Sequence, residues 1–396
     1  MKQNRPPKTV QLVIDPFEQP VSGAELRNDA VKRALMPFTD VTVVSPKDFA
    51  VSNQRLTGNK SAPTLLAPDE TCVQNFVKYI GHERPDILLF EGVGLLKFCE
   101  ALVSQSVFKI PRLVLDFHNV ESALWEENVF ARMGVLRRLW KARRVVGARE
   151  SVRLADREAV RLSDAVLVPT GEDRQRLTDL VGDEKQAGKI RVVPNIAPSW
   201  ALRRLAAAPV ANERGGIRRL LFVGHLRYTP NVEAVDALVH RIWPQLRGEF
   251  LDMRLVIAGR NPARRVRRWA GSRTDIELHA DPSSLDGIYD GCDVAIMPLR
   301  QGGGSRLKVL EAFAVGMPVI ATAKAVEGLG LTPDRHWLRA ETAQDYVAAI
   351  RRLIRDPGLG ARLVGEGRAL VAERYTDKAL ADTLAPIIRD LNPQRA

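Results

Sequence analysis

The sequence predicts an α/β protein with two doubly wound domains, each built on a parallel sheet. Short apolar runs alternate with longer helical patterns, as in strand–helix–strand units. The alternation occurs in two successive series, and residues 197–216 between them are rich in Ala, Pro and charge, as a linker is. The length of 396 residues suits two domains. We therefore expect domains over residues 1–196 and 197–375, followed by a C-terminal helix in residues 376–396.

The first series is expected to form the N-terminal sheet. Its predicted strands are, in order, Val10–Ile14, Val41–Val44, Pro85–Phe90, Arg112–Leu115, Ala165–Pro169 and Arg191–Val193. Helices are expected from Gly23 to about Leu35 and near Gly94–Val103. Residues 46–70 show neither period and are expected to be loop. In such sheets ligands bind beyond the carboxyl ends of the strands, so residues there are the candidates for function.

The second series is expected to form the C-terminal sheet. Its predicted strands are Arg219–Val223, Met253–Ala258, Ile276–Leu278, Asp293–Met297 and Val319–Thr322. Its main helices are expected at about 232–246, 306–315, 346–354 and 359–372. Four arginines between residues 264 and 268 are expected to form a solvated helix face.

The stretch from Gly302 to Gly316 carries the strongest chemical signal. Its glycines bring bare backbone N–H groups near a ligand, and Ser305 is a good helix N-cap. Arg306 and Lys308 then lie in the first helical turn, where the helix dipole disfavours cations. A phosphate at this N-terminus would compensate both charges, and Glu311, one turn on, could accept hydrogen bonds from ribose hydroxyls. The alternative is a solvated Lys–Glu pair behind a flexible loop; the coincidence of glycines, cations and carboxylate favours the ligand.

The run Gly-Gly-Gly-Ser-Arg-Leu-Lys-Val-Leu-Glu-Ala-Phe-Ala-Val-Gly-Met-Pro-Val-Ile-Ala-Thr resembles the donor-site signature of family-4 retaining glycosyltransferases. The resemblance implies the GT-B fold, in which two Rossmann-like domains face each other across a cleft. In that family one glutamate holds the donor ribose and maps onto Glu311. Another holds the sugar ring and maps onto Gly303, so this chain resembles the branch with Gly-Gly-x-Arg-x-Lys-x-x-Glu. Gly303 and Gly304 are then implied to contact the donor.

Three further positions are implied by the same resemblance. Gly23 matches the loop that faces the donor phosphate, and Gly224 matches the first loop of the donor domain. Many members carry an arginine and a lysine in that second loop, where this chain has His225 and Asn231. Arg306 and Lys308 are therefore expected to supply the charge for the pyrophosphate. Arg374-Tyr375-Thr376 resembles the last motif of the family, after which the final helix returns to the first domain.

His118 follows a predicted strand, in the run Asp116-Phe117-His118-Asn119-Val120-Glu121. An isolated histidine of this kind is commonly a loop residue that satisfies backbone groups. Its place at a strand end, and the likeness of the run to the His-bearing segment beside the reacting sugar in the family, favour a catalytic role. We expect His118 to contact the donor sugar or the acceptor hydroxyl; Asp116 and Glu121 are weaker candidates.

Residues 131–153 read as a basic amphipathic helix. Two interpretations are equally supported. The helix packs on its own domain with a solvated basic face, or it contacts anionic headgroups or a lipid-linked acceptor. The residues expected to make that contact are Arg137, Arg138, Trp140 and Lys141.

Composition narrows the class of partner. The net charge of +12 suggests polyanions, anionic membrane or phosphorylated substrates, whereas an aromatic content of 6%, scattered along the chain, disfavours a nucleic-acid binder. No apolar run reaches the length of about 18 residues that a membrane span needs, and no signal peptide is apparent. Cys72, Cys99 and Cys292 have no metal spacing and read as free thiols of a reducing compartment. We expect a cytoplasmic protein, with peripheral attachment to the inner face of the membrane as an extension.

The function that these features indicate together is sugar transfer from a nucleotide-diphosphate sugar to a glycan or lipid-linked acceptor. The resemblance implies retention and a place in polysaccharide or glycolipid assembly. No Asp-x-Asp motif is visible, so we expect neither a metal ion nor a cofactor besides the donor. The expected enzyme is of the hexosyltransferase type. The alternatives are a sugar-nucleotide epimerase on the same architecture and a non-catalytic polyanion-binding protein.

Overall fold

The computed structural model describes residues 6–16, 22–50, 65–105, 107–127, 142–207, 216–303 and 306–391. The chain divides into two compact units. The N-terminal unit contains residues 1–195, with 303–305 and 377–396, and the C-terminal unit contains residues 196–302 and 306–376. Each unit holds one six-stranded sheet in which every pair of strands is parallel. The predicted α/β class with two parallel sheets is confirmed.

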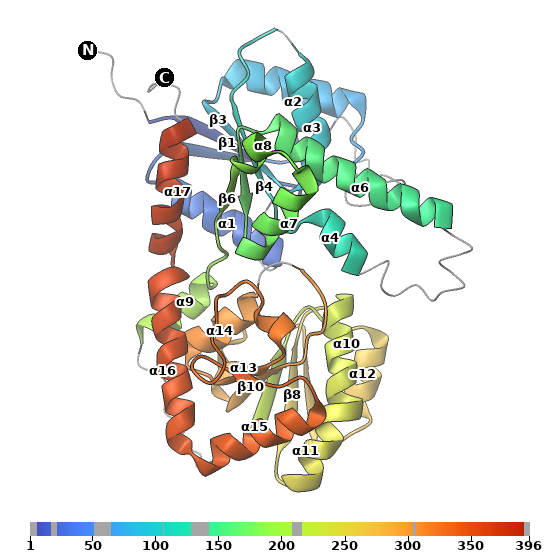
Figure 1. Cartoon of the computed structure of the whole chain (residues 1–396), viewed down its shortest axis with the longest axis vertical. Coiled ribbons are helices and arrows are strands. Elements are labelled where there is room, and N and C mark those ends of the chain that lie inside the picture. Colours follow the sequence, from blue (N-terminus) through green and yellow to red (C-terminus); the bar gives the residue numbers. More distant parts are fainter. Residues whose placement is uncertain are drawn as a thin grey trace. The chain divides into compact units, whose positions relative to one another are not determined.

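The N-terminal sheet has the strand order β2-β1-β3-β4-β5-β6 (Figure 1). Its strands are β1 (Lys8–Leu12), β2 (Asp40–Val44), β3 (Ile87–Glu91), β4 (Arg112–Asp116), β5 (Ala165–Val168) and β6 (Ile190–Val192). The order reverses between β1 and β3, and this switch point is where ligands bind in such folds. Strands β3 and β5 are buried throughout, which is why they read as continuous apolar runs.

Helices of the N-terminal unit cover the sheet. They are α1 (Gly23–Leu35), α2 (Glu70–Glu83), α3 (Leu96–Ser104), α4 (Glu121–Trp125), α6 (Ala142–Leu162), α7 (Gly171–Val181), α8 (Glu184–Ala187) and α17 (Asp377–Leu391). Short 3₁₀ turns lie at Pro46–Asp48 and Val93–Leu95. Helix α17 packs along α1, where Arg33 pairs with Asp377 at 2.9 Å (Figure 1).

The C-terminal sheet has the order β12-β11-β10-β7-β8-β9. Its strands are β7 (Arg219–Val223), β8 (Arg254–Gly259), β9 (Ile276–Ala280), β10 (Val294–Met297), β11 (Val319–Ala321) and β12 (Leu338–Arg339). The switch point lies between β7 and β10, so the loops that follow these two strands meet at one place.

The helices of this unit lie on both faces of its sheet (Figure 1). They are α9 (Ser199–Ala206), α10 (Thr229–Ala237), α11 (Trp243–Glu249), α12 (Arg264–Gly271), α13 (Asp286–Asp290), α14 (Leu307–Val315), α15 (Ala343–Arg355) and α16 (Pro357–Arg374). A π-helical stretch, η4 (Leu238–Ile242), joins α10 to α11, and a 3₁₀ turn, η5, spans Ala323–Val326.

Several predicted elements need correction. The expected single helix at 232–246 is α10, η4 and α11 in succession. Helix α2 was not predicted, and it begins at the end of the stretch 46–70 that was expected to be loop. Its N-cap Asp69 accepts a hydrogen bond from the Cys72 backbone N–H at 2.7 Å. The expected linker at 197–216 contains α9. Helix α6 continues to Leu162 because an apolar stripe persists beyond residue 153, including Val160 at the core.

Two expectations from composition can be compared with the structure. All three cysteines are unpaired, with Cys72 and Cys99 buried. Among the helices that the structure describes, none is long and apolar enough to cross a bilayer.

Candidate active site

Glycines bring the loop that follows β7 close to the end of the neighbouring strand β8. At Gly259, which ends β8 with φ +151°, a Cβ would lie 1.8 Å from the carbonyl oxygen of Gly224. A Cβ on Gly224 would lie 2.9 Å from the side chain of Asn231. Only glycine fits at these contacts. The loop after β7 therefore folds over the start of α10, and the Asn231 amide donates to the His225 carbonyl at 3.0 Å.

Helix α14 carries two cations toward this loop. Arg306 occupies the N-cap position in place of the predicted Ser305, which lies outside the described residues; Gly316 ends the helix with φ +85°, as predicted. The Arg306 guanidinium is 7% exposed and donates to the Gly302 carbonyl at 3.0 Å and to Glu327 Oε2 at 3.1 Å. Lys308 Nζ donates to Asn231 Oδ1 at 2.7 Å. Residues 306 and 308 thus join the loops that follow β7 and β10.

The environment of Lys308 disfavours its positive charge. Its Nζ lies 5.1 Å from the centre of the Phe222 ring, and its hydrogen-bond partner Asn231 is neutral. Burial, and then the nearby Arg306, lower the pKa of Lys308 from 10.5 to about 7. The nearby Glu311 opposes the shift, and a further anion at this position would oppose it more strongly.

Glu311 lies one turn further along the same helix. Its side chain is buried, and Tyr289 Oη donates to its Oε2 at 3.1 Å. Burial raises the pKa of Glu311 to about 7, while the Tyr289 hydrogen bond and the charge of Lys308 oppose the shift. Tyr289, itself fully buried, holds this carboxylate in place and was not foreseen from the sequence. The result is a buried acid one turn below a buried cation, at the point where a doubly wound sheet binds its ligand.

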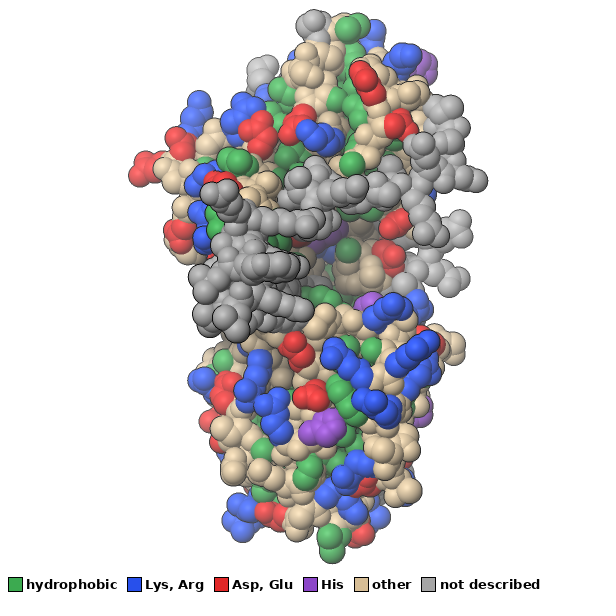
Figure 2. Space-filling view, turned by 90° about the vertical axis from the view of Figure 1, so that its right-hand side faces the viewer, with side chains coloured by type: hydrophobic (Ala, Val, Ile, Leu, Met, Phe, Trp, Pro, Cys, Tyr) green, Lys and Arg blue, Asp and Glu red, His purple; other side chains and the backbone are tan. Residues whose placement is uncertain are grey.

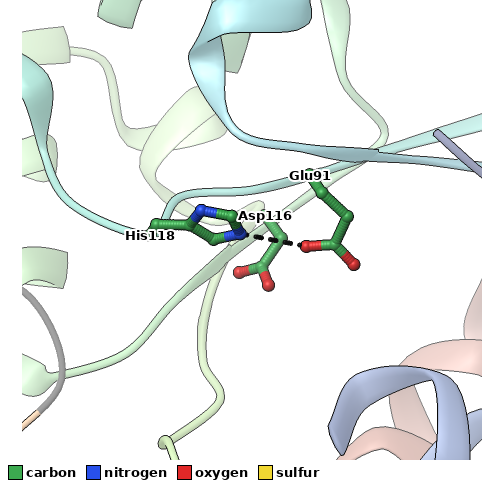
Figure 3. Close-up of side chains that lie close together, drawn as sticks. All are labelled: Glu91, Asp116 and His118. Carbon is green, nitrogen blue, oxygen red and sulfur yellow. Dashed lines mark hydrogen bonds and ion pairs between the residues drawn. The ribbon is translucent and has the colours of Figure 1, made fainter. Parts of the chain in front are cut away.

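The N-terminal unit brings His118 to a buried carboxylate (Figure 3). His118 follows β4, and its Nε2 lies 3.2 Å from Oε2 of Glu91, the last residue of β3. Glu91 is fully buried, and its Oε1 accepts from Gln11 Nε2 at 2.6 Å. Burial and the neighbouring Asp116 raise the pKa of Glu91, while His118 and Gln11 oppose the shift. The His118 side chain is 17% exposed, so it is the member of this group that a ligand can reach.

Asp116 is occupied by an arginine from α1. Arg27 donates to Asp116 from Nε at 2.7 Å and from Nη2 at 2.6 Å. Both side chains of this bidentate pair are buried. The same guanidinium donates to the Val193 carbonyl and to Asn195 Oδ1, so it ties α1 and β4 to the segment after β6. Asp116, a weaker candidate from the sequence, therefore has a structural role.

Glu91, Asp116 and His118 lie within 4.8 Å of one another, close enough to share a metal ion (Figure 3). The chemistry of their partners argues against that use. Both oxygens of Asp116 already accept from Arg27, whose charge would repel a cation, and Glu91 accepts from a glutamine amide. The cluster fits a hydrogen-bond network that holds an imidazole better than it fits a metal centre.

The remaining predicted residues are placed as follows. Gly23 is the exposed first residue of α1, behind an N-cap Ser22 whose hydroxyl accepts from the Glu25 backbone N–H. The His225 side chain is exposed, and Gly303 is half-buried. Gly304 lies outside the described residues, as do the four candidates for membrane contact: Arg137, Arg138, Trp140 and Lys141. The donor-site and catalytic assignments of all these residues stay predictions.

Besides Tyr289, four residues of the N-terminal cluster were missed in the sequence: Gln11, Arg27, Asn28 and Glu91. Gln11 is a polar residue inside an otherwise apolar strand, and Glu91 closes another, so each carried a visible signal. Arg27 and Asn28 lie on a helix face that reads as ordinary surface, although both are buried.

Comparisons with known proteins agree with this architecture. Residues 217–356 match the family model described as glycosyl transferases group 1. An uncharacterized 44.6 kDa protein in the cps region of Klebsiella pneumoniae is 32% identical over 142 residues, which are 34% of this chain and 36% of that protein. The matched part thus spans about a third of the length of this curated relative.

Two solved structures share the fold over the whole chain. Sucrose-phosphate synthase from Thermosynechococcus elongatus has a TM-score of 0.68 at 17% identity, covering 97% of this chain and 99% of that one. Anabaena HepE, solved in complex with UDP and glucose, has a TM-score of 0.66 at 13% identity, covering 97% and 100%. The chain therefore has the GT-B fold, and residues 217–356 are similar to the group 1 glycosyl transferases.

Proposed function

We propose that this protein transfers a sugar from a nucleotide-diphosphate sugar to a glycan or lipid-linked acceptor. The reaction is of the hexosyltransferase type, proceeds with retention, and requires neither a metal ion nor a cofactor besides the donor. It belongs to polysaccharide or glycolipid assembly, in the cytoplasm or at the inner face of the membrane, and does not involve nucleic acid. The fold, the group 1 domain and the likeness to the family-4 branch with Gly-Gly-x-Arg-x-Lys-x-x-Glu support this proposal.

One observation carries the proposal: two cations and a carboxylate share the first turns of α14 at the C-terminal switch point. Arg306 and Lys308 stand where a helix N-terminus and a glycine loop already favour an anion. Burial and Arg306 lower the pKa of Lys308 despite the nearby Glu311, so a further anion would favour its charged form. A diphosphate leaving group supplies that charge, and preorganised cations stabilise it as its bond to the sugar breaks. Anabaena HepE, of the same fold, binds UDP and glucose, which supports a nucleotide-sugar donor here.

Glu311 fits the ribose end of such a donor. The buried Glu311 carboxylate accepts from the Tyr289 hydroxyl through Oε2, and two carboxylate oxygens have capacity for further hydrogen bonds, such as those from the two ribose hydroxyls. His118 is proposed to contact the donor sugar or the acceptor hydroxyl, since it is the reachable member of the N-terminal cluster.

The test is calorimetry of the wild-type protein with UDP, GDP and a panel of their sugars, followed by product analysis. We expect one nucleotide to bind, and binding to weaken in Glu311→Ala but not in Arg264→Ala, an exposed arginine on α12. Turnover that persists in EDTA and yields a product with the anomeric configuration of the donor supports metal independence and retention. If an altered nucleotide sugar forms without an acceptor, the epimerase alternative is supported. If the protein binds RNA and no nucleotide sugar, the polyanion-binding alternative is supported.

A further inference from the structure

The contact between Glu91 and His118 determines which imidazole nitrogen is left to contact the substrate. We propose that Glu91 is a positioning residue: it holds the His118 ring by Nε2, keeps a proton on that nitrogen, and leaves Nδ1 to accept a hydrogen bond from a sugar or acceptor hydroxyl. This inference rests on the proposed function for its last step, the contact with substrate. The orientation of the ring and the position of its proton do not depend on that function.

Three polar groups converge on the Glu91 carboxylate. Gln11 Nε2 donates to Oε1 at 2.6 Å, and it is itself fixed because it also donates to the Asn28 carbonyl at 3.0 Å. With its amide nitrogen turned toward the pair, Asn28 donates to Glu91 Oε2 at 3.0 Å and to the Ala24 carbonyl at 3.0 Å. His118 Nε2 is the third, at 3.2 Å from Oε2. Burial and Asp116 raise the pKa of Glu91, and the hydrogen bonds from Gln11 and His118 oppose that shift by favouring the ionised form. In that form the carboxylate can only accept.

Asn28 is the competitor that could reverse the tautomer. Its amide nitrogen lies 2.8 Å from His118 Nε2, so a hydrogen bond in that direction would require a lone pair on Nε2. One amide hydrogen is engaged by the Ala24 carbonyl, and the other has both Oε2 and Nε2 in reach. A carboxylate is the stronger acceptor, since hydrogen bonds to charged groups are about twice as strong as neutral ones. The second amide hydrogen therefore goes to Glu91, and Nε2 donates to the same carboxylate.

The other ring nitrogen, Nδ1, is not the one that faces Glu91. Nδ1 points away from Glu91, and a Cβ placed on Gly92 would lie 3.9 Å from it (Figure 3). Glycine at that position, with φ +105°, leaves this side of the ring without a neighbouring side chain from residue 92. Nε2 is thus used for positioning, and Nδ1 is the nitrogen left for substrate.

Glu91→Gln inverts the arrangement without changing the shape of the side chain. Gln11 still donates toward the position of Oε1, so the new amide must place its oxygen there and its nitrogen toward His118. That nitrogen is a donor, and Nε2 must then accept, which moves the ring proton to Nδ1. The variant should therefore present a donor to the substrate where the wild-type protein presents an acceptor.

The experiment is long-range ¹H–¹⁵N NMR of the histidine rings at about pH 8.5, where imidazoles are neutral. The His118 signals are assigned by their loss in His118→Ala, and thermal unfolding checks that each variant is folded. We expect Nε2–H as the main tautomer in wild type and Nδ1–H in Glu91→Gln. Asn28→Ala, which removes only the competing donor, should keep Nε2–H and provides the test if Glu91→Gln does not fold. The same tautomer in wild type and Glu91→Gln, or Nδ1–H in wild type or in Asn28→Ala, would overturn the proposal.

A kinetic measurement tests the step that depends on function. In Glu91→Gln we expect kcat to fall at least tenfold while the KM for the nucleotide sugar stays within twofold, because the nucleotide is held by residues of α14. Full turnover together with an inverted tautomer would overturn the role of Nδ1 in substrate contact. If wild-type protein transfers no sugar from any nucleotide donor, the proposed function fails, and the tautomer result still decides whether Glu91 positions the ring.

Discussion

Replacing Lys308 by Met is expected to stabilise the protein and to weaken donor binding at the same time. The Lys308 ammonium lies over Phe222, and its pKa is lowered from 10.5 to about 7 by burial and then by Arg306. Methionine is also long and flexible, so it can fill the same space against the ring without the charge. The variant removes a cation that the fold holds at a cost and that the ligand is proposed to need.

The magnitude follows from the two pKa values. A pKa unit corresponds to about 1.4 kcal/mol, so the shift is equivalent to about 4 kcal/mol of lost stability at pH 7. Lys308 is half-buried, and solvent screening reduces this to about 2 kcal/mol. Between pH 7 and 10.5 the unfolded lysine keeps its proton while the folded one releases it. The unfolded state then binds more protons, so wild-type stability rises with pH in this window.

The assay is urea unfolding of wild type and Lys308→Met at pH 7 and pH 9, with Lys97→Met as the matched control on an exposed helix position. The stability advantage of Lys308→Met should shrink by about 1–2 kcal/mol between the two pH values, and the control should show no such trend. Calorimetry with the nucleotide that binds should show at least tenfold weaker affinity for Lys308→Met alone. A variant that is less stable than wild type at pH 7, or an advantage that does not change with pH, would refute the reasoning.

Four other outcomes are expected. Glu311→Gln, which mimics the protonated carboxyl, should weaken donor binding by about 1–3 kcal/mol, and calorimetry should show the gap widening from pH 6 to pH 8 as wild-type Glu311 ionises near pH 7. Asp116→Asn should lower the free energy of unfolding by about 3–5 kcal/mol, because Arg27 stays buried without its anion; denaturant titration that finds less than 1 kcal/mol contradicts this. His118→Ala should cut turnover at least tenfold with nucleotide affinity unchanged, and full turnover would return it to the class of structural loop histidines. The basic stretch 131–153 should carry the protein to anionic but not to neutral liposomes in flotation, with loss at high salt; flotation without such dependence removes the membrane role.

The surface of the C-terminal unit sharpens the choice between a solvated and a ligand-binding cation. Figure 2 shows Lys and Arg side chains gathered on the side that carries α12. The four arginines of that helix are exposed, and Arg267 lies 3.4 Å from Asp281, as expected for a solvated face. Exposed cations of this kind cost the fold little, since water screens them. Arg306 and Lys308 differ because the first is buried and the second half-buried, at the start of a helix whose first turn disfavours cations.

The elements that the sequence predicted are those specified by local physics. Buried parallel strands such as β7 read as apolar runs, and the predicted range Arg219–Val223 is the observed one. The end of α14 at Gly316 was predicted because a left-handed residue after a helix favours glycine. The π-helical stretch η4 was not predicted, because nothing in the local pattern at 238–242 distinguishes it from a regular helix.

The parts of the site that escaped prediction depend on contacts between distant segments. Arg27 and Asp116 are 89 positions apart, and Lys308 and Asn231 are 77 apart. In the sequence, Asn231 stands where many members of the family carry a lysine. In the structure, Asn231 accepts a hydrogen bond from Lys308, a lysine of another helix, α14. Such an exchange becomes visible only when the sheet order sets the loops after β7 and β10 side by side.

The two switch points differ in how well the charges of their side chains are matched by partners within the protein. In the N-terminal unit the buried charges are matched within the protein: Arg27 has its aspartate, and Glu91 has amide and imidazole donors. In the C-terminal unit Lys308 has a neutral amide and an aromatic face, and its charge is opposed by Arg306. Packing alone would be better served by an uncharged side chain at that position, because burying a cation without an anion lowers stability. This is the reason for the proposal that a ligand brings a further anion to the amino end of α14.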